Sequence, residues 1–182
     1  VDYDAKNAIV LTSSSKGKLN RFRLRQILLE NVCEDFTASI CCEPAKIKFL
    51  SSGSLCVLDY NMNIFLHNSI TNDWKRAAQL DAERQKVIVI EAWENRLFFM
   101  TRNSILIFDY DTASDSLQFT SELVIDHEKF SLQFEYFRAM HALNFHQVFI
   151  SDASGACIVI DLKHQKLMKA FKIPKSVEPW ST

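Results

Sequence analysis

Residues able to do chemistry are common in this 182-residue chain, but their spacing matches no catalytic motif. No pair of its histidines has a strong metal-binding spacing: His141 and His146 are five residues apart, and Cys33, Cys41 and Cys42 do not form a Cys-x-x-Cys set. No Gly-x-Ser-x-Gly turn marks a hydrolase nucleophile, and three glycines are too few for a phosphate loop or a dinucleotide fingerprint. We therefore expect a protein that is not an enzyme and that holds no metal and no cofactor. The residues considered are His67, His127, His141, His146, His164, Cys33, Cys41, Cys42, Cys56 and Cys157.

A short basic segment near the N-terminus is the strongest local charge feature. Arg21, Arg23 and Arg25 alternate with apolar residues, and Lys18 precedes them. On a strand this alternation places the three guanidinium groups on one face. Guanidinium groups bind phosphates and carboxylates, so the face predicts contact with nucleic acid or with an acidic protein segment. The alternative is a solvated strand face whose charge is balanced by acidic residues downstream.

A second and weaker basic cluster contains Trp74 and Arg76. The net charge of the whole chain is only −1, so any attraction to nucleic acid or membrane has to come from such local clusters. Partner-binding residues predicted from the sequence are Lys18, Arg21, Arg23, Arg25, Trp74 and Arg76.

The cysteines indicate the compartment. Their number is odd, Cys41 and Cys42 are adjacent, and Cys56 and Cys157 lie inside apolar runs. This pattern is typical of free thiols used as small core residues, which favours the reducing cytosol or nucleus. No apolar run approaches the roughly 18 residues that span a bilayer, and no signal peptide is visible at the start. We expect an intracellular protein.

One sequence pattern recurs along the chain. Gly17, Gly53, Asn103 and Gly155 each follow an apolar run and a turn, and each opens a second apolar run. In the last three copies the second run ends six residues later in an aspartate: Asp59, Asp109 and Asp161. A tight hairpin needs glycine or asparagine where the backbone must take a positive φ. The pattern therefore predicts one strand–turn–strand unit that is repeated about four times, which is typical of propeller blades.

The strands expected in each unit can be given their order. We expect the run before each turn to be the second strand, the run after it the third, and an outer strand to follow. This makes Ile47–Leu50 a second strand, Leu55–Leu58 a third and Ile64–Leu66 an outer strand. The units cover about 1–32, 40–70, 87–120 and 137–173 of a single domain, 1–182. The segment 71–86 has a helix-forming composition and predicts a short helical insertion.

These repeated patterns resemble the repeats of the WD-repeat family of β-propellers, in which an aspartate lies six residues after a glycine. Gly53–Asp59, Asn103–Asp109 and Gly155–Asp161 keep that spacing. The position before the aspartate, where the family has tryptophan, holds Leu58, Phe108 and Ile160. The chain is thus similar to a degenerate WD-like propeller in which the hydrogen-bond network of the family is missing.

The resemblance implies an all-β fold of about four blades and a non-catalytic role as a protein-interaction scaffold in an intracellular multiprotein complex. Four blades do not usually close such a propeller. The chain is therefore expected to be part of a larger propeller, or to be completed by a partner or by a second copy. The alternative function is a nucleic-acid-associated subunit that uses the Arg21, Arg23 and Arg25 face.

Overall fold

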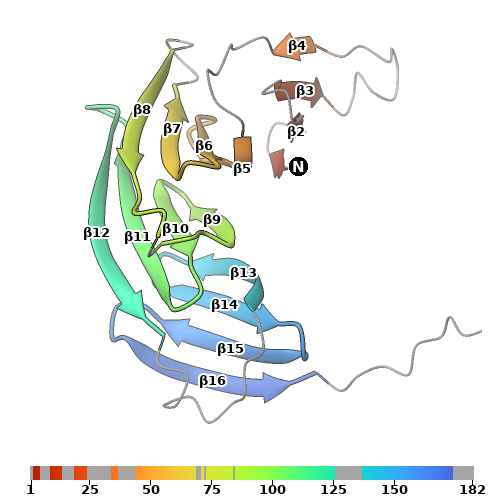
Figure 1. The fold of residues 1–182 in the computed structure, drawn as a ribbon, viewed down its shortest axis with the longest axis vertical. Coiled ribbons are helices and arrows are strands. Elements are labelled where there is room, and N and C mark those ends of the chain that lie inside the picture. The colour runs from red at the N-terminus through yellow and green to blue at the C-terminus, as the bar shows by residue number, and fades with distance from the viewer. Residues whose placement is uncertain are drawn as a thin grey trace, which may run out of the picture. The chain divides into compact units, whose positions relative to one another are not determined.

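The computed structural model shows an all-β chain made of four small sheets (Figure 1). It describes residues 2–4, 9–13, 19–23, 34–36, 44–68, 71, 73–83, 85–125 and 137–173. In these ranges 16 strands form four antiparallel sheets of four strands each, and no helix is present. Strands that are consecutive in the chain are neighbours in their sheet, so each sheet is a simple meander. The predicted all-β fold of about four blades is confirmed.

The strands have the following bounds. The first sheet holds β1 Asp2–Asp4, β2 Ile9–Ser13, β3 Leu19–Arg23 and β4 Glu34–Phe36. The second holds β5 Pro44–Phe49, β6 Leu55–Asp59, β7 Asn63–His67 and β8 Trp74–Gln79. The third holds β9 Val89–Trp93, β10 Arg96–Met100, β11 Ser104–Asp111 and β12 Ser116–Val124. The fourth holds β13 Phe137–Asn144, β14 Gln147–Asp152, β15 Ala156–Asp161 and β16 Lys166–Lys172.

The chain divides into two compact units, and each is described by itself. Unit 1 contains Val1–Lys86 and Tyr110–Gln118, and unit 2 contains Val87–Asp109 and Phe119–Thr182. Unit 2 therefore holds the whole fourth sheet and most of the third. The organisation of 1–182 as one domain stays a prediction.

Long apolar runs become strands that are buried on both faces. Every residue of β10, and every residue of β6 in unit 1, is buried. One face of the third sheet packs on one face of the fourth and forms the core of unit 2. Burying these side chains removes large apolar areas from water, which stabilises the stacked sheets. The core includes Phe98, Met100, Ile105, Ile107, Met140, Val148, Ile150, Ile158 and Ile160.

Two of the cysteines are core residues, as expected. Cys56 in β6 and Cys157 in β15 are free thiols with no exposed surface. Burial raises the pKa of the Cys56 thiol to about 12, because the thiolate loses its hydration there. Both thiols are therefore protonated and inert at neutral pH. Cys33, Cys41 and Cys42 lie outside the described residues.

The predicted glycine turns are confirmed at two positions and wrong at a third. Gly53 and Gly155 have φ values of 80° and 84°. Gly17 lies outside the described residues. Asn103 does not have a positive φ, because the side chain of Thr101 shapes that turn instead. Its hydroxyl oxygen accepts hydrogen bonds from the backbone N–H of Ser104 at 3.0 Å and of Asn103 at 3.3 Å.

The expected helix at 71–86 is wrong, because this segment contains β8. Trp74 pairs with His67 and Gln79 pairs with Asn63 along β7. Helix propensity is a weak preference, and here the open edge of β7 and the packing of Trp74 against Val57 outweigh it. The fourth place of the second sheet is thereby filled by β8, which changes the order of the other strands.

The expected strand order is correspondingly wrong in the second sheet. The strands predicted there as second, third and outer are the first, second and third, β5, β6 and β7. In the third and fourth sheets the turn of the repeated pattern joins the second and third strands as predicted, β10 to β11 and β14 to β15. Asp59 therefore ends a second strand, whereas Asp109 and Asp161 lie in third strands.

Substitution by alanine should affect these two turns differently. A Cβ at Gly155 would lie 3.1 Å from the carbonyl oxygen of Ile173 and would have to accept a left-handed φ. Gly155→Ala should lower the free energy of unfolding by about 1–2 kcal/mol. Asn103→Ala should change it by less than about 0.5 kcal/mol, because that backbone position is unstrained.

Urea unfolding followed by circular dichroism measures both variants under the same conditions. Equal losses of stability in the two variants would contradict this account of the turns.

Candidate protein-interaction surface

Three turns of unit 2 lie together at one end of the third and fourth sheets. They join β9 to β10, β13 to β14 and β15 to β16. Arg96 at the start of β10 contacts the β13–β14 turn, and the N–H of Leu162 in the β15–β16 turn donates to the carbonyl oxygen of His146 at 2.7 Å. We call the exposed residues of these turns the turn rim: Trp93, Glu94, Phe145, His146, Lys163 and His164.

Arg96 is the residue that ties the first two turns together. Its Nε and Nη2 donate to the two carboxylate oxygens of Asp109 at 2.6 and 2.8 Å. Its Nη1 donates to the carbonyl oxygen of Phe145 at 3.2 Å, and the guanidinium carbon lies 3.5 Å from the centroid of the Phe145 ring. A bidentate ion pair and a cation–π contact thus use both the edge and the face of one guanidinium group.

Asp109 carries the other half of this contact. Thr120 on β12 donates its hydroxyl to Asp109 Oδ2 at 2.9 Å. The hydrogen bonds from Arg96 hold the pKa of the Asp109 carboxyl below its usual range, although burial opposes them. One carboxylate therefore links strands β10, β11 and β12, and Arg96 extends the link to the fourth sheet.

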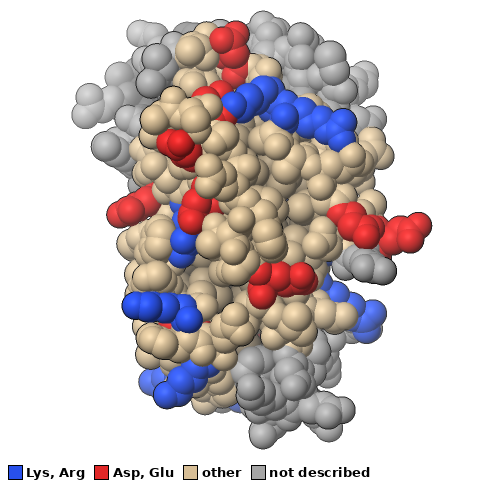
Figure 2. All heavy atoms as spheres, turned by 90° about the vertical axis from the view of Figure 1, so that its left-hand side faces the viewer, with Lys and Arg blue, Asp and Glu red and all other residues tan. Residues whose placement is uncertain are grey.

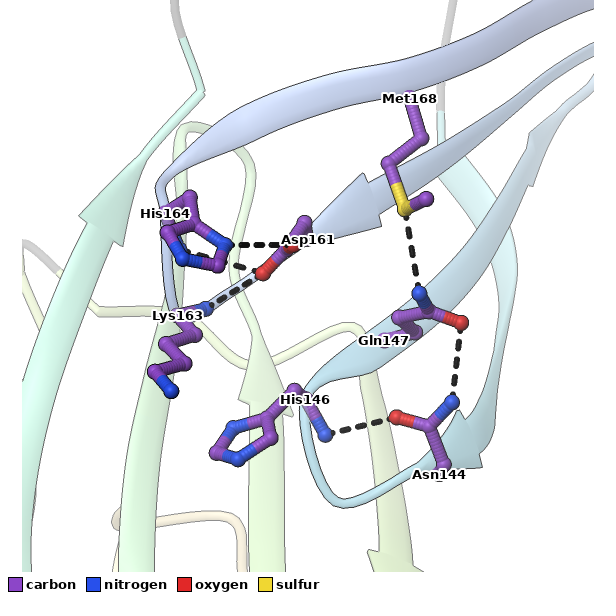
Figure 3. A network of polar contacts seen from close by, with 7 residues as sticks. All are labelled: Asn144, His146, Gln147, Asp161, Lys163, His164 and Met168. Carbon is purple, nitrogen blue, oxygen red and sulfur yellow. Dashed lines mark hydrogen bonds and ion pairs between the residues drawn. The ribbon is translucent and has the colours of Figure 1, made fainter.

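The β13–β14 turn is shaped by an asparagine (Figure 3). Asn144 Oδ1 accepts the backbone N–H of His146 at 2.9 Å, and its Nδ2 donates to Gln147 Oε1 at 2.9 Å. Gln147 Nε2 in turn points to the sulfur of Met168 on β16, at 3.2 Å. The turn is therefore fixed by its own side chains as well as by Arg96.

The β15–β16 turn is capped by Asp161 (Figure 3). Its Oδ1 accepts the N–H groups of Lys163 at 2.9 Å and of His164 at 3.1 Å. Its Oδ2 lies 2.8 Å from Nδ1 of the His164 ring. These hydrogen bonds, the one with the His164 ring first, hold the pKa of the Asp161 carboxyl below its usual range. The cap fixes the backbone of the turn and orients the imidazole of His164, and 65% of the His164 side chain stays exposed.

The turn rim combines aromatic, basic and imidazole groups. Trp93 and Phe145 are 37% and 39% exposed, and the ring of His146 packs edge-on against Phe145 with centroids 5.0 Å apart. Large aromatic side chains surrounded by polar groups are typical of protein-interaction hot spots. In the described part of the chain, no cluster of three His, Cys, Asp or Glu side chains could hold a metal ion.

None of the site residues predicted from the sequence is a residue of the turn rim. Arg21 and Arg23 lie in β3, where they pair with Leu11 and Ile9 of β2. Lys18 and Arg25 lie outside the described residues. The role of all these residues in binding stays a prediction.

Trp74 and Arg76 are placed in β8 of unit 1. Trp74 packs with Val57 and its ring lies 4.8 Å from that of His67, so it serves the core. Arg76 is exposed and donates to Gln79. On the face that Figure 2 shows, the described basic side chains stand in small groups among acidic ones.

Comparison with known proteins shows the fold. No family model and no curated protein sequence matches the chain. Solved structures do match: the luciferin-regenerating enzyme with a TM-score of 0.65 and 11% identity, a chain of the mitotic checkpoint complex with 0.62 and 12%, and U3-55K with 0.65 and 9%. The last two are WD-type propellers. The fold is that of a WD-like β-propeller. At these identities the likeness extends to the fold alone.

The chain is also shorter than the structures it matches. The matches cover 96%, 90% and 94% of this chain but only 62%, 46% and 50% of the luciferin-regenerating enzyme, the checkpoint-complex chain and U3-55K. The chain thus spans about half to two thirds of the length of these structures, which is consistent with the predicted partial propeller. Among the described residues, no helix has the length and hydrophobicity needed to cross a bilayer.

The Arg96–Asp109 pair predicts a defined dependence of stability on pH. Asp109→Asn should lower the free energy of unfolding at pH 7 by about 1–3 kcal/mol; solvent screens the 41% exposed carboxylate and keeps the loss below that of a buried pair. The folded-state pKa of Asp109 is depressed, so its contribution is present above the unfolded pKa of about 3.9 and is lost as the pH falls through the folded value.

The wild type and Asp109→Asn should therefore converge in stability below about pH 4. Denaturant unfolding at a series of pH values measures this, and comparison of the two proteins cancels the other carboxyls. A stability difference that stays constant down to pH 2 would show that the ion pair is not its cause.

Proposed function

We propose that this chain is a non-catalytic scaffold that holds partner proteins of an intracellular complex on its turn rim. The observation that carries the proposal is that Trp93 and Phe145 are exposed at one end of the sheets, beside turns that Asn144 and Asp161 cap from within. Aromatic side chains held in place before binding lose little conformational freedom when a partner arrives. One similar fold is found in the mitotic checkpoint complex, which supports assembly as a use of this architecture, whereas another belongs to an enzyme.

The buried free thiols support a reducing compartment, the cytosol or the nucleus. The partners we propose are proteins with an apolar group for the aromatic side chains and acidic groups for Lys163 and the two histidines. Complementary charge at the edge of such a contact chiefly raises the rate of association.

The alternative, a nucleic-acid-associated subunit, rests on the alternation of Arg21, Arg23 and Arg25 in the sequence. Residues Arg21, Asn20 and Leu19 of β3 pair with Glu34, Asp35 and Phe36 of β4, so acidic residues stand beside this basic strand. That pairing favours the balanced, solvated strand face over a phosphate-binding one. Nucleic-acid binding would weaken steeply with added salt, which distinguishes the two functions.

Removing rim side chains should abolish capture of partners without unfolding the protein. The double variant Trp93→Ala/Lys163→Ala deletes one aromatic and one basic group, and neither forms a contact of the Arg96 link. Tagged wild type and variant are incubated with cell extract, and bound proteins are quantified by mass spectrometry at 50 and 300 mM salt. We expect at least about a tenfold loss of the proteins that the wild type enriches.

The matched control is Tyr60→Ala/Lys86→Ala, which removes an exposed aromatic and an exposed lysine of unit 1. It should capture the same proteins as the wild type. Equal losses in both double variants, or no loss in either, would refute the role of the turn rim. Enrichment of RNA-dependent proteins that disappear after nuclease treatment would favour the alternative.

A further inference from the structure

Four residues other than glycine have a left-handed backbone in the described part of the chain. They are Met62, Glu94, Asp115 and Gln165, with φ values of 61°, 52°, 49° and 49°. This conformation brings Cβ close to the following carbonyl oxygen, so glycine or asparagine is the usual residue at such positions. A longer side chain is kept there at a cost in stability, which points to a use for that side chain.

Two of these side chains serve the fold of unit 1. The side chain of Met62 is part of the buried apolar core. Asp115 accepts a hydrogen bond from the hydroxyl of Tyr110, and its Oδ2 lies 2.9 Å from Nζ of Lys75. Burial explains the first of these residues and an ion pair explains the second, because glycine could supply neither.

The other two side chains have no such contact, and both lie in turns of unit 2 that form the turn rim. Glu94 is in the β9–β10 turn, and Gln165 is in the β15–β16 turn directly after His164. Both are exposed, and no hydrogen bond or ion pair joins either side chain to another described residue. Only Glu94 is charged, so Glu94 is the residue that indicates the chemistry of a binding partner.

Glu94 directly follows Trp93, so a carboxylate and an indole ring are neighbours in the chain. Trp93 pairs with Arg96 across the hairpin, and the side chains of such a pair lie on the same face of the sheet. The guanidinium group of Arg96 is already bound to Asp109 and Phe145. The carboxylate of Glu94 is therefore not neutralised by Arg96, which is the only cation of the β9–β10 hairpin.

Unit 2 itself shows what an aromatic ring and a carboxylate bind together. The guanidinium carbon of Arg96 lies 3.5 Å from the centroid of the Phe145 ring, and the edge of the same group donates to Asp109 at 2.6 and 2.8 Å. An arginine satisfies both groups because its cation is planar, whereas the ammonium group of lysine is a point charge. Tryptophan is the best of the aromatic rings for such a contact.

We propose that Trp93 and Glu94 bind an arginine side chain of the partner protein, with the guanidinium face on the indole ring and its edge on the carboxylate. Glu94 is thus the residue that makes the turn rim specific for arginine. This inference rests on the proposed function, which it deepens by naming one group of the partner. The apolar group of the partner is then left to Phe145, and its acidic groups to Lys163 and the histidines.

The stability of glycine variants tests whether Glu94 serves the fold. Glu94→Gly removes the strain and no internal contact, so its urea midpoint of unfolding should equal or exceed that of the wild type. Asp115→Gly, at a left-handed position whose side chain is used internally, should have a lower midpoint because it loses the contacts with Tyr110 and Lys75. A midpoint of Glu94→Gly below that of the wild type would overturn the proposal, because the carboxylate would then act within the fold.

The specificity is tested with a phage-displayed library of random peptides selected on the immobilised full chain. Peptides that bind the wild type should be enriched in arginine over the starting library. Selection on Glu94→Gln, which keeps the size of the side chain and removes its charge, should lose this enrichment. The matched control is Glu122→Gln, the same substitution at an exposed position of β12, which should select the same peptides as the wild type. Selected peptides without enriched arginine would overturn the proposal.

A double-mutant cycle with one selected peptide then measures the contact itself. Replacement of the peptide arginine by alanine should raise the dissociation constant for the wild type at least about threefold, and that for Glu94→Gln by less. Replacement by lysine should also weaken binding to the wild type, because the stacking on Trp93 is lost. An equal effect of the arginine-to-alanine change on wild type and Glu94→Gln would contradict the pairing.

The failure of this inference can be told from a failure of the proposed function. Loss of peptide binding in Trp93→Ala/Lys163→Ala, together with an unchanged arginine preference in Glu94→Gln, would refute the arginine contact and leave the turn rim as the binding surface. Peptide binding that the double variant does not change would refute the role of the turn rim, and this inference with it.

Discussion

The contact of Arg96 with Asp109 and Phe145 is the interaction on which the arrangement of unit 2 depends. Apolar burial alone would let two sheets slide over one another, because it is nearly independent of direction. The guanidinium group adds direction: its edge is paired with a carboxylate of its own sheet, and its face and remaining donor meet the Phe145 turn of the next sheet. Only 11% of the Arg96 side chain is exposed, so water competes little for these bonds. The position of the turn rim follows from this contact.

The aspartate of the repeated sequence pattern makes different contacts in each sheet. Asp161 caps the turn that follows β15, whereas Asp109 binds Arg96 and leaves the corresponding cap to Asp111, two residues later, whose Oδ1 accepts the N–H of Ala113 at 2.9 Å. Asp59 accepts the N–H of Asn63 at 2.8 Å after a second strand. A short acidic side chain at a strand end satisfies whichever donors the local turn presents. The six-residue spacing is therefore the same in the three copies, whereas the hydrogen bonds of the aspartates differ.

Much of the fold could be predicted from the sequence, because buried strands leave long apolar runs such as Leu97–Met100 and tight turns leave glycines such as Gly155. The errors have physical causes. Ala77 and Ala78 favour a helix in isolation, but the edge of β7 holds them in a strand. A hydroxyl, that of Thr101, replaced the left-handed residue expected at Asn103. Arg96 and Phe145 were missed because their contact joins residues 49 apart, which no local pattern records. An arginine at the start of an otherwise apolar strand was the one available signal.

The central claim is that the turn rim is rigid before any partner binds. Native-state hydrogen exchange measured by NMR tests it directly at the N–H groups of His146, Lys163 and His164, each of which donates to a side chain of its own turn. The account predicts that these amides exchange at least about tenfold more slowly than in an unfolded chain, and that those of Lys163 and His164 lose this protection in Asp161→Ala. Exchange at the unfolded rate in the wild type would contradict it, because the rim would then be mobile and would gain its shape only on binding.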